Sequence, residues 1–349
     1  MSRLHFLPGQ GFDCSGCAKC CRSPWQVAVD EPSRKRMVEL PVRDGLVQVE
    51  GRWVTGKRDG ACVFLTDDQL CSVHAQLGSS AKPHTCRQFP FHYQDTPDGV
   101  FVGVSFYCSA VQRNEGRPLA VHEEELNSLL AQIPAPRRAG RLWLRPDSWV
   151  EWPTYLQLEE RLPSREAVAR ALLLLPLAPP GELTALEDLL GGELPSDPML
   201  AWMENSFVAG LAARLEGVAL DDVLADKPVL CGQVTPSAVQ AALAGGSPAW
   251  LREGVERYRA ALLFRKFLLS GERPLLENLL VLHLALRVCE AYAWAHALAA
   301  DRLEPTQEDL FRALDRCELD LLTHGGEAFT MSGSFTEFFL QRYPRESSE

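Results

Sequence analysis

Hydrophobic and polar positions change their pattern about a third of the way along the chain. Before residue 109 the apolar residues form short runs rich in Val, Phe, Leu and aromatic side chains. Gly and Asp separate these runs at turns such as Asp59-Gly60 and Asp98-Gly99, and this alternation predicts short strands joined by turns. The expected strands are Trp25–Val29, Leu46–Val49, Cys62–Thr66 and Val100–Tyr107.

From about residue 122 the apolar positions recur with a helical period. The longest example is a seam that steps by four and three residues, which predicts a helix packed inside a bundle. This seam consists of Leu275, Leu279, Leu282, Leu286, Cys289 and Ala293. Similar patterns predict helical faces over 260–268 and 310–321, and Thr184, Thr235 and Thr306 stand where helix N-caps are expected.

These patterns predict an α+β protein that is mostly α. A small, irregular, cysteine-rich domain with short strands, residues 1–121, precedes an all-helical domain, residues 122–349. We place the boundary there because the segment from Arg113 to Pro118 is polar and turn-forming.

The chain has 349 residues and a formal net charge of −11, which is unevenly distributed. Residues 1–120 carry +2 and residues 121–349 carry −13. This acidic balance argues against a general nucleic-acid binder, because phosphate contacts need clustered Lys and Arg. No signal-peptide pattern opens the sequence, and it lacks a run of about 20 uncharged apolar residues. We therefore expect a cytoplasmic protein with neither a membrane nor a nucleic acid as partner.

Eight of the eleven cysteines lie in the first 108 residues. Four form the dense motif Cys14-x2-Cys17-x2-Cys20-Cys21, and the others are Cys62, Cys71, Cys86 and Cys108. Two residues between cysteines let the chain turn so that both sulfurs reach one metal ion. Eight thiolates suit two four-thiolate sites, or one iron–sulfur cluster and one further metal. In a reducing cytoplasm this pattern favours metal ligands over four disulfides, which are the alternative interpretation.

Cations and aromatic residues accompany these cysteines. Lys19, Arg22 and Arg87 flank them and would stabilise thiolate charge. Arg87 directly follows a cysteine, and we assign it as the residue that contacts the cofactor. The segment Phe89-Pro90-Phe91 is interpreted as apolar shielding of the metal site from water. Candidate substitute ligands are His74, His84 and His92.

The other cysteines and two helical histidines have simpler interpretations. Cys289 and Cys317 lie in apolar helical stripes, where a free cysteine packs as a small hydrophobic residue. Cys231 is interpreted as packed in a loop, with an exposed thiol as the alternative. His283 and His296 each stand alone on a predicted helix and are interpreted as hydrogen-bonded structural residues.

The cysteine-rich segment resembles a known family over roughly residues 10–110. The motifs that carry the resemblance are Phe12-x-Cys14-x2-Cys17-x2-Cys20-Cys21, Cys62-Val-Phe-Leu65, Cys71-Ser-Val-His74 and Lys82-Pro83-x2-Cys86-Arg87-Gln-Phe89-Pro90-Phe91. In this order they are similar to the YkgJ-type cysteine-cluster family, a zinc- or iron-chelating domain that includes the bacterial flagellin lysine N-methylases. The family's commoner Arg-Pro is Lys82-Pro83 here. The resemblance implies that the eight cysteines named above are the metal ligands.

Three functions follow from the motifs and the resemblance. The first is a metal-binding protein that holds iron–sulfur or zinc through the eight cysteines. The second is an S-adenosylmethionine-dependent lysine N-methyltransferase acting on flagellin or another surface protein, because the flagellin methylases also couple the cluster to a helical C-terminal part. The third is a protein-interaction module that the metal only braces. The sequence contains no strand–G-x-G–helix unit of an ordinary S-adenosylmethionine fold and assigns no catalytic residue.

Overall fold

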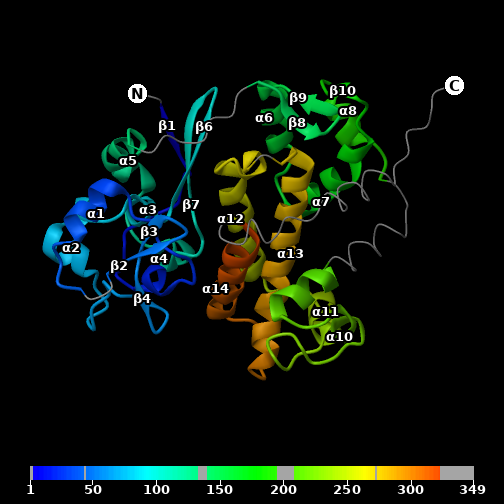
Figure 1. Cartoon of the computed structure of the whole chain (residues 1–349). Coiled ribbons are helices and arrows are strands. Elements are labelled where there is room, and N and C mark those ends of the chain that lie inside the picture. The colour runs from blue at the N-terminus through cyan, green and yellow to red at the C-terminus, as the bar shows by residue number, and fades with distance from the viewer. Residues whose placement is uncertain (1–2, 43–44, 133–139, 195–207, 272, 323–349) are drawn as a thin grey trace. The chain divides into compact units, whose positions relative to one another are not determined.

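Figure 1 shows the computed structural model of the chain, which describes residues 3–42, 45–132, 140–194, 208–271 and 273–322. The chain divides into two compact units, Met1–Arg137 and Arg138–Glu349. The predicted fold class is confirmed, because the protein is mostly helical and its strands form small sheets. The division between the units falls later than the predicted boundary at 121/122, because α5 (Glu123–Leu130) packs against α3 (His84–Gln88) in the N-terminal unit.

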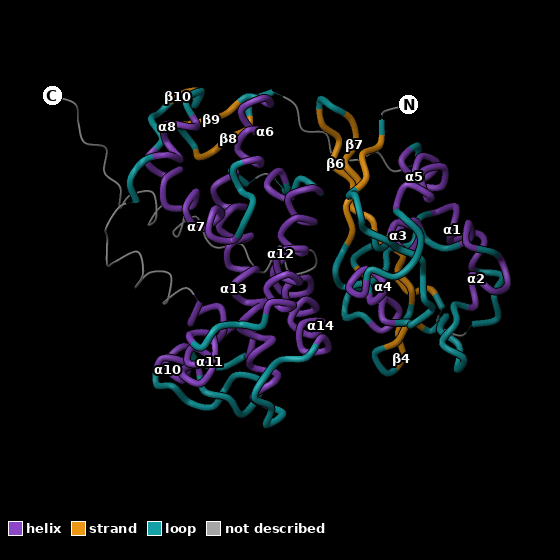
Figure 2. The backbone as a smooth tube through the Cα atoms, turned by 180° about the vertical axis from the view of Figure 1, so that it is seen from behind, coloured by secondary structure: helices purple, strands orange, loops and turns teal. Residues whose placement is uncertain are grey.

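The largest sheet of the N-terminal unit joins the start of the chain to residues far along the sequence. Its strand order is β1 (Leu4–Phe6), β7 (Gly99–Val104) and β6 (Phe91–Thr96) (Figure 2). β1 runs parallel to β7, with Leu4 opposite Val100, and β6 runs antiparallel to β7. The predicted strand over 100–107 corresponds to β7.

Two small hairpins follow one another in the same unit. β2 (Leu46–Val49) pairs with β3 (Arg52–Thr55), and β4 (Lys57–Arg58) pairs with β5 (Ala61–Cys62). Each hairpin turns on an acidic residue followed by glycine, both at positive φ, which matches the twist of two paired strands. The predicted strand over 46–49 is confirmed, whereas the segment over 25–29 contributes only an isolated bridge at Ala28.

Short helices connect these strands around a small core. They are η1 (Lys19–Arg22), α1 (Glu31–Met37), α2 (Ser72–Leu77), η2 (Ser79–Ala81), α3, α4 (Ser109–Arg113), η3 (Leu119–His122) and α5. One cluster of the core consists of Val29, Met37, Leu40, Phe64, Val73 and Ala81. Further buried apolar residues of this unit lie outside this cluster, among them Val102, Phe106 and Leu126.

The C-terminal unit is built around one long helix, α13 (Leu275–Ala299). α7, α11, α12 and α14 all pack against it, and this burial matches the predicted seam. The helices of this unit are α6 (Trp152–Glu160), α7 (Arg165–Leu174), η4 (Leu175–Leu177), α8 (Leu186–Gly191), a helix whose described part spans 208–216, α10 (Leu220–Leu224), α11 (Pro236–Ala244), α12 (Ala249–Phe264), η5 (Phe267–Leu269), α13, α14 (Gln307–Arg316) and a π-helical turn (Cys317–Leu322).

The structure confirms some of the predicted helix ends and contradicts others. Thr235 and Thr306 cap α11 and α14 as predicted, and Thr306 forms a capping box with Asp309. The cap predicted at Thr184 is wrong, because α8 begins at Leu186 after Ala185. The helical face predicted over 260–268 is interrupted at Lys266, whose φ of 60° ends the helix.

The C-terminal unit also contains a small sheet that the hydrophobic pattern did not indicate. β8 (Leu142–Arg145), β9 (Ser148–Val150) and β10 (Gly181–Glu182) form it in the order β10-β9-β8 (Figure 2). Strands this short carry too few residues for a period-two pattern to stand out. Among the described residues, no helix combines the length and the hydropathy that crossing a bilayer requires.

Gly116 fixes the chain just before the first cysteine. It has a φ of 106°, and a Cβ atom there would lie 2.2 Å from the backbone nitrogen of Asp13. We expect Gly116→Ala to destabilise the N-terminal unit by about 3 kcal/mol, because backbone strain and a backbone clash add. Gly60→Ala is the matched control: its φ is 78°, but its Cβ would meet nothing within 4 Å. We expect that variant to lose about 1 kcal/mol in thermal unfolding, and equal losses would contradict the role given to the Gly116–Asp13 contact.

Candidate metal centre

The dense cysteine motif lies on an irregular segment that turns sharply. Its first two cysteines are exposed in a loop, and Cys20 and Cys21 lie in η1. Gly16 and Ala18 have φ angles of 67° and 59°, so the chain changes direction between successive cysteines. Glycine adopts this conformation freely, whereas alanine does so at a cost. The local turning that two-residue spacing requires for a metal chelate is therefore present in the backbone.

The segment before Cys14 is tied to residues that follow α4. The backbone N–H of Phe12 donates to the Arg117 carbonyl at 2.9 Å, and the Arg117 guanidinium donates to both Asp13 carboxylate oxygens. The side-chain hydrogen bond from Arg117 is the main reason why the pKa of Asp13 falls to about 2. His122 Nε2 lies 2.8 Å from the Phe12 carbonyl oxygen. These contacts place the start of the cysteine motif beside the segment 117–122.

Backbone hydrogen bonds close the loop between Cys62 and Cys71. Leu65 and Cys71 form an isolated bridge, and the Ser72 N–H donates to the Phe64 carbonyl at 2.8 Å. Cys62 ends β5, Cys71 is the N-cap of α2, and both pack against the cluster that contains Phe64. The core therefore positions these two thiols although they are nine positions apart in the sequence.

Electrostatic interactions show that distant cysteines face one another. Burial raises the pKa of the Cys86 thiol to about 12, and negative charge on Cys62, Cys20 and Cys71 adds to the increase. Burial is likewise the main reason why the pKa of Cys62 is raised, with a further contribution from Cys71. Thiols from β5, α2, α3 and η1 therefore lie close enough to feel each other's charge.

Cys20 and Cys21 form a hydrogen-bonded pair. Their mutual hydrogen bond lowers the pKa of Cys20 and raises that of Cys21. Cys62 and Cys71 also raise the pKa of Cys21. The Cys20–Cys21 pair is thus electrostatically linked to Cys62 and Cys71.

Cys108 lies at the edge of this group, as the N-cap of α4. Burial raises its pKa to about 11, and charges on Cys17 and Cys20 contribute. Cys20, Cys21, Cys62, Cys71 and Cys86 therefore form one electrostatically linked group, and Cys108 is linked to it through Cys20 and also to Cys17. Cys14 is exposed in its loop.

Two lysines that the cysteine spacing did not indicate act as counterions of the thiols. Lys82 lowers the pKa values of Cys20 and Cys86, and Lys57 lowers that of Cys62. Lys82 lies within the recognised motif, four positions before Cys86, which is the signal that could have identified it. Lys57 is near because its hairpin pairs it directly with Cys62.

Arg87 is placed differently from these lysines. Its charge acts on Tyr93, whose pKa is raised by burial and lowered by this guanidinium. Its assignment to a cofactor stays a prediction. His84, a candidate substitute ligand, has partners for both ring nitrogens: Nε2 lies 2.9 Å from Gln132 Oε1, and Nδ1 lies 3.7 Å from Asp30.

Aromatic side chains pack next to η1 and α4. The ring of Trp25 lies 4.9 Å from that of Tyr107 and 5.9 Å from that of Phe89, measured between centroids. The Lys19 ammonium lies 4.7 Å from the Tyr107 centroid. Phe89 precedes Pro90 through a cis peptide bond. The shielding of a metal site by this segment stays a prediction.

The chemistry of the donor set fits a metal that prefers sulfur. All eight cysteines are free thiols, and thiolates are preferred by zinc and by iron in iron–sulfur clusters. Neighbouring thiolates repel one another, so several of these thiols are hard to ionise at the same time. A bound cation would stabilise their negative charge. Within the part of the chain that the structure describes, no three His, Cys, Asp or Glu side chains already have metal-site geometry.

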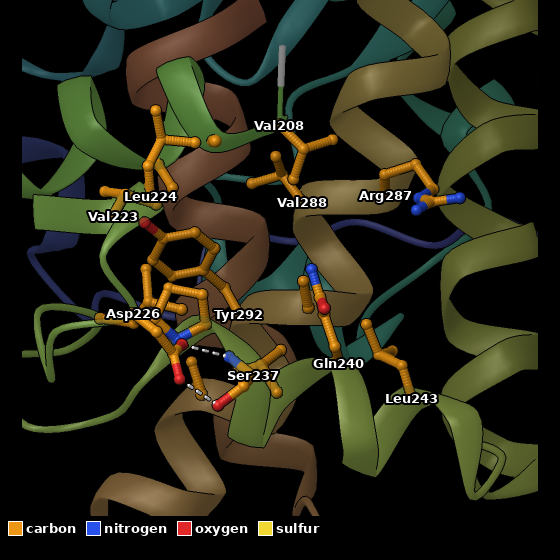
Figure 3. Close-up of a pocket in the computed structure, with 17 residues that line it drawn as sticks. Val208, Val223, Leu224, Asp226, Ser237, Gln240, Leu243, Arg287, Val288 and Tyr292 are labelled. Carbon is orange, nitrogen blue, oxygen red and sulfur yellow. Dashed lines mark hydrogen bonds between the residues drawn. The ribbon is translucent and has the colours of Figure 1, made fainter. Parts of the chain in front are cut away.

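The C-terminal unit contains a cavity of about 540 Å³ with different chemistry. Apolar side chains such as Val223, Leu224 and Val288 line most of it, and Tyr292 forms part of its wall (Figure 3). Its polar edge includes Asp226, which accepts hydrogen bonds from Ser237. This lining suits an apolar group rather than a metal.

The N-terminal unit therefore has the features of a metal-chelating cysteine domain: converging thiols, facing lysines and a small core. Comparison with known families agrees. Residues 13–113 match the family model CxxCxxCC, described as "Putative zinc- or iron-chelating domain". This part of the chain is similar to the CxxCxxCC family, and the resemblance expected over roughly residues 10–110 is confirmed.

Curated relatives are similar to about a third of the chain or less. The Flagellar biosynthetic protein FliU of Salmonella muenchen is 27% identical over 115 residues, which are 29% of this chain and 68% of that protein. The Lysine-N-methylase of Salmonella typhimurium is 28% identical over 116 residues, 29% of each chain. An uncharacterised protein of Methanocaldococcus jannaschii is 25% identical over 117 residues, 33% of this chain and 42% of that protein. The similarity thus spans less than half of the latter two proteins, and no solved structure matches the chain.

Proposed function

We propose that the N-terminal unit binds a transition metal, as an iron–sulfur cluster or as zinc, through Cys14, Cys17, Cys20, Cys21, Cys62, Cys71, Cys86 and Cys108. The observation that carries this proposal is the convergence of thiols from four separate elements on one region, next to Lys57 and Lys82. The matching family description supports it.

The eight thiols divide unequally in space, which bears on how many metals they hold. Cys20, Cys21, Cys62, Cys71 and Cys86 supply enough donors for one four-thiolate site. Of the other three, Cys14 and Cys17 are exposed and Cys108 is partly buried, and charges on Cys17 and Cys20 both act on Cys108. We propose one site in the first group and a second, more exposed one that uses the remaining thiols.

Metal analysis and a visible spectrum of one anaerobic preparation test this proposal. An iron–sulfur protein is brown and contains stoichiometric iron and sulfide, whereas a zinc protein is colourless and contains stoichiometric zinc. Either result supports metal binding and identifies the metal. A folded protein that carries neither metal and takes up neither on reconstitution contradicts the proposal.

A second candidate function is methyl transfer to a protein lysine, with S-adenosylmethionine as methyl donor. The observation that favours it is that curated relatives of the cysteine domain are named Lysine-N-methylase. The expected substrate is flagellin or another surface protein, and the expected location is the cytoplasm. The chain's own contribution would be to bind the donor and to orient the lysine.

Radiolabelled S-adenosylmethionine distinguishes this candidate from a metal-braced interaction module. The metal-loaded protein is incubated with the labelled donor and flagellin, and label is located by peptide mapping. Methyl groups on lysine support the methyltransferase, whereas retention of flagellin on the immobilised protein without methylation supports the interaction module. A colourless zinc protein would oppose an iron–sulfur methylase.

A further inference from the structure

A thiol and an imidazole are in direct contact in the C-terminal unit. Cys231 Sγ lies 3.3 Å from His296 Nδ1, within hydrogen-bond distance for sulfur. The two residues are 65 positions apart, and no local pattern pairs them. His296 is hydrogen-bonded as expected, but its partner is a nucleophilic atom.

The backbone holds Cys231 in an uncommon conformation. It lies in a tight turn closed by reciprocal hydrogen bonds of 2.9 Å between Leu230 and Val234. Cys231 and Gly232 have φ angles of 49° and 80°, and non-glycine residues seldom adopt this region without support. The Gln233 side chain donates to the Ala299 carbonyl and so ties the turn to the end of α13, which also carries His296.

The surroundings keep the resting pair neutral. Burial raises the pKa of Cys231 to about 11 and lowers the pKa of His296. The charged groups that face the pair are Glu216, Asp309, Arg312 and Arg316. A neutral imidazole has a free lone pair on one nitrogen, so it can accept the thiol proton when the sulfur attacks an electrophile.

Cys231 is accessible to solvent, unlike the other two cysteines of its unit. Cys289 and Cys317 are fully buried, and Cys317 Sγ donates to the Ala285 carbonyl at 3.3 Å. Cys231 is only partly buried. Of these three thiols it alone combines contact with solvent and contact with a base.

The apolar cavity lies next to the pair. The Tyr292 ring forms part of its wall (Figure 3) and meets the His296 ring edge-on, with centroids 6.3 Å apart. Leu230, which precedes the cysteine, lines the same cavity. The organic part of a reactant can therefore be accommodated near the sulfur.

We propose that Cys231 is a covalent modification site that undergoes thiol–disulfide exchange with a low-molecular-weight disulfide, with His296 as the base. The sulfur of Cys231 attacks one sulfur of the disulfide, whose S–S bond breaks as the new S–S bond forms. The thiol proton moves to His296 Nδ1 and then to the departing thiolate. Cys231 is thereby oxidised to a mixed disulfide, and the other half of the reagent is reduced to a thiol. This proposal does not depend on the metal or on methyl transfer.

The test exposes the full-length, metal-loaded protein to glutathione disulfide and measures the modification of each cysteine by peptide mapping. Cys231 is the only cysteine between Arg214 and Arg252, so its tryptic peptide is unambiguous. We expect Cys231 to react at least about tenfold faster than Cys289 and Cys317. Equal rates at the three sites would overturn the proposal.

His296→Gln tests the base. Glutamine can accept a hydrogen bond but cannot take up the proton, so we expect the rate at Cys231 to fall about tenfold or more at neutral pH. At alkaline pH the rate should approach that of the wild type, because the thiol then ionises without a base. His283→Gln, on the same helix, is the matched control and should leave the rate unchanged. A folded His296→Gln protein with the wild-type rate at neutral pH would refute the role of His296.

Discussion

Cys20→Ala is expected to abolish metal binding at the buried group of thiols and to unfold the N-terminal unit at a much lower temperature. Cys20 is hydrogen-bonded to Cys21, acts electrostatically on Cys86 and Cys108, and has Lys82 as counterion. Structural zinc contributes about 10–16 kcal/mol in small domains. A loss of only about 3 kcal/mol would already lower the unfolding temperature by roughly 12–24 °C. Metal content and thermal unfolding measure the two effects.

Cys289→Ala is the matched control for this experiment. Its thiol is fully buried in α13 of the other unit, so metal content should match the wild type. Cys17→Ala should also lose metal, as its thiol faces Cys108 in the more exposed group. If all three variants lost metal equally, the division of the cysteines into ligands and packing residues would be wrong.

Glu318→Gln is expected to destabilise the C-terminal unit by about 3–5 kcal/mol. Glu318 is fully buried, accepts a hydrogen bond from Tyr258 Oη at 2.9 Å, and lies 3.6 Å from the Arg265 guanidinium. Arg265 is buried as well. Removing the carboxylate charge takes away the negative charge that faces this buried guanidinium, and in a region shielded from water that loss is expected to dominate. Urea unfolding of the full chain measures the loss.

Glu187→Gln provides the comparison for this buried pair. Its ion pair with Arg161 is largely exposed, so the loss should stay below about 1 kcal/mol. Replacing both buried partners, Arg265→Met with Glu318→Leu, should recover much of the stability because no unpaired charge remains. If Glu318→Gln cost no more than Glu187→Gln, the buried pair would not have the importance assigned to it.

Regular periodicity over many residues made the long helices predictable. The seam from Leu275 to Ala293 lies in α13, and the capping box at Thr306 starts α14. The end of α12 was not predictable in the same way. Lys266 ends it in a left-handed conformation, and its ammonium pairs with Glu159, which is distant in sequence. Such a tertiary contact overrides the local apolar pattern and leaves no mark in it.

In the candidate site, too, local features were predictable from the sequence and tertiary contacts were not. The cysteine spacing is a local feature, so the sequence alone predicted the ligand types and the matching domain. The facing lysines are not local: Lys57 reaches Cys62 only through a hairpin register. The contact between Cys231 and His296 likewise depends on how a turn lies against the end of α13. The spacing indicated the proposed donors, whereas their neighbours could be found only from the fold.

The parallel pairing of β1 with β7 has a consequence for the order of events during synthesis. Leu4 finds its partner Val100 only after nearly the whole N-terminal unit has been translated. The proposed ligands obey the same constraint, since Cys14 is made early and Cys108 last. The nascent chain therefore carries unpaired thiols and an unpaired first strand until that point. If the eight cysteines are the ligands, as we propose, the complete set becomes available only after residue 108 has left the ribosome.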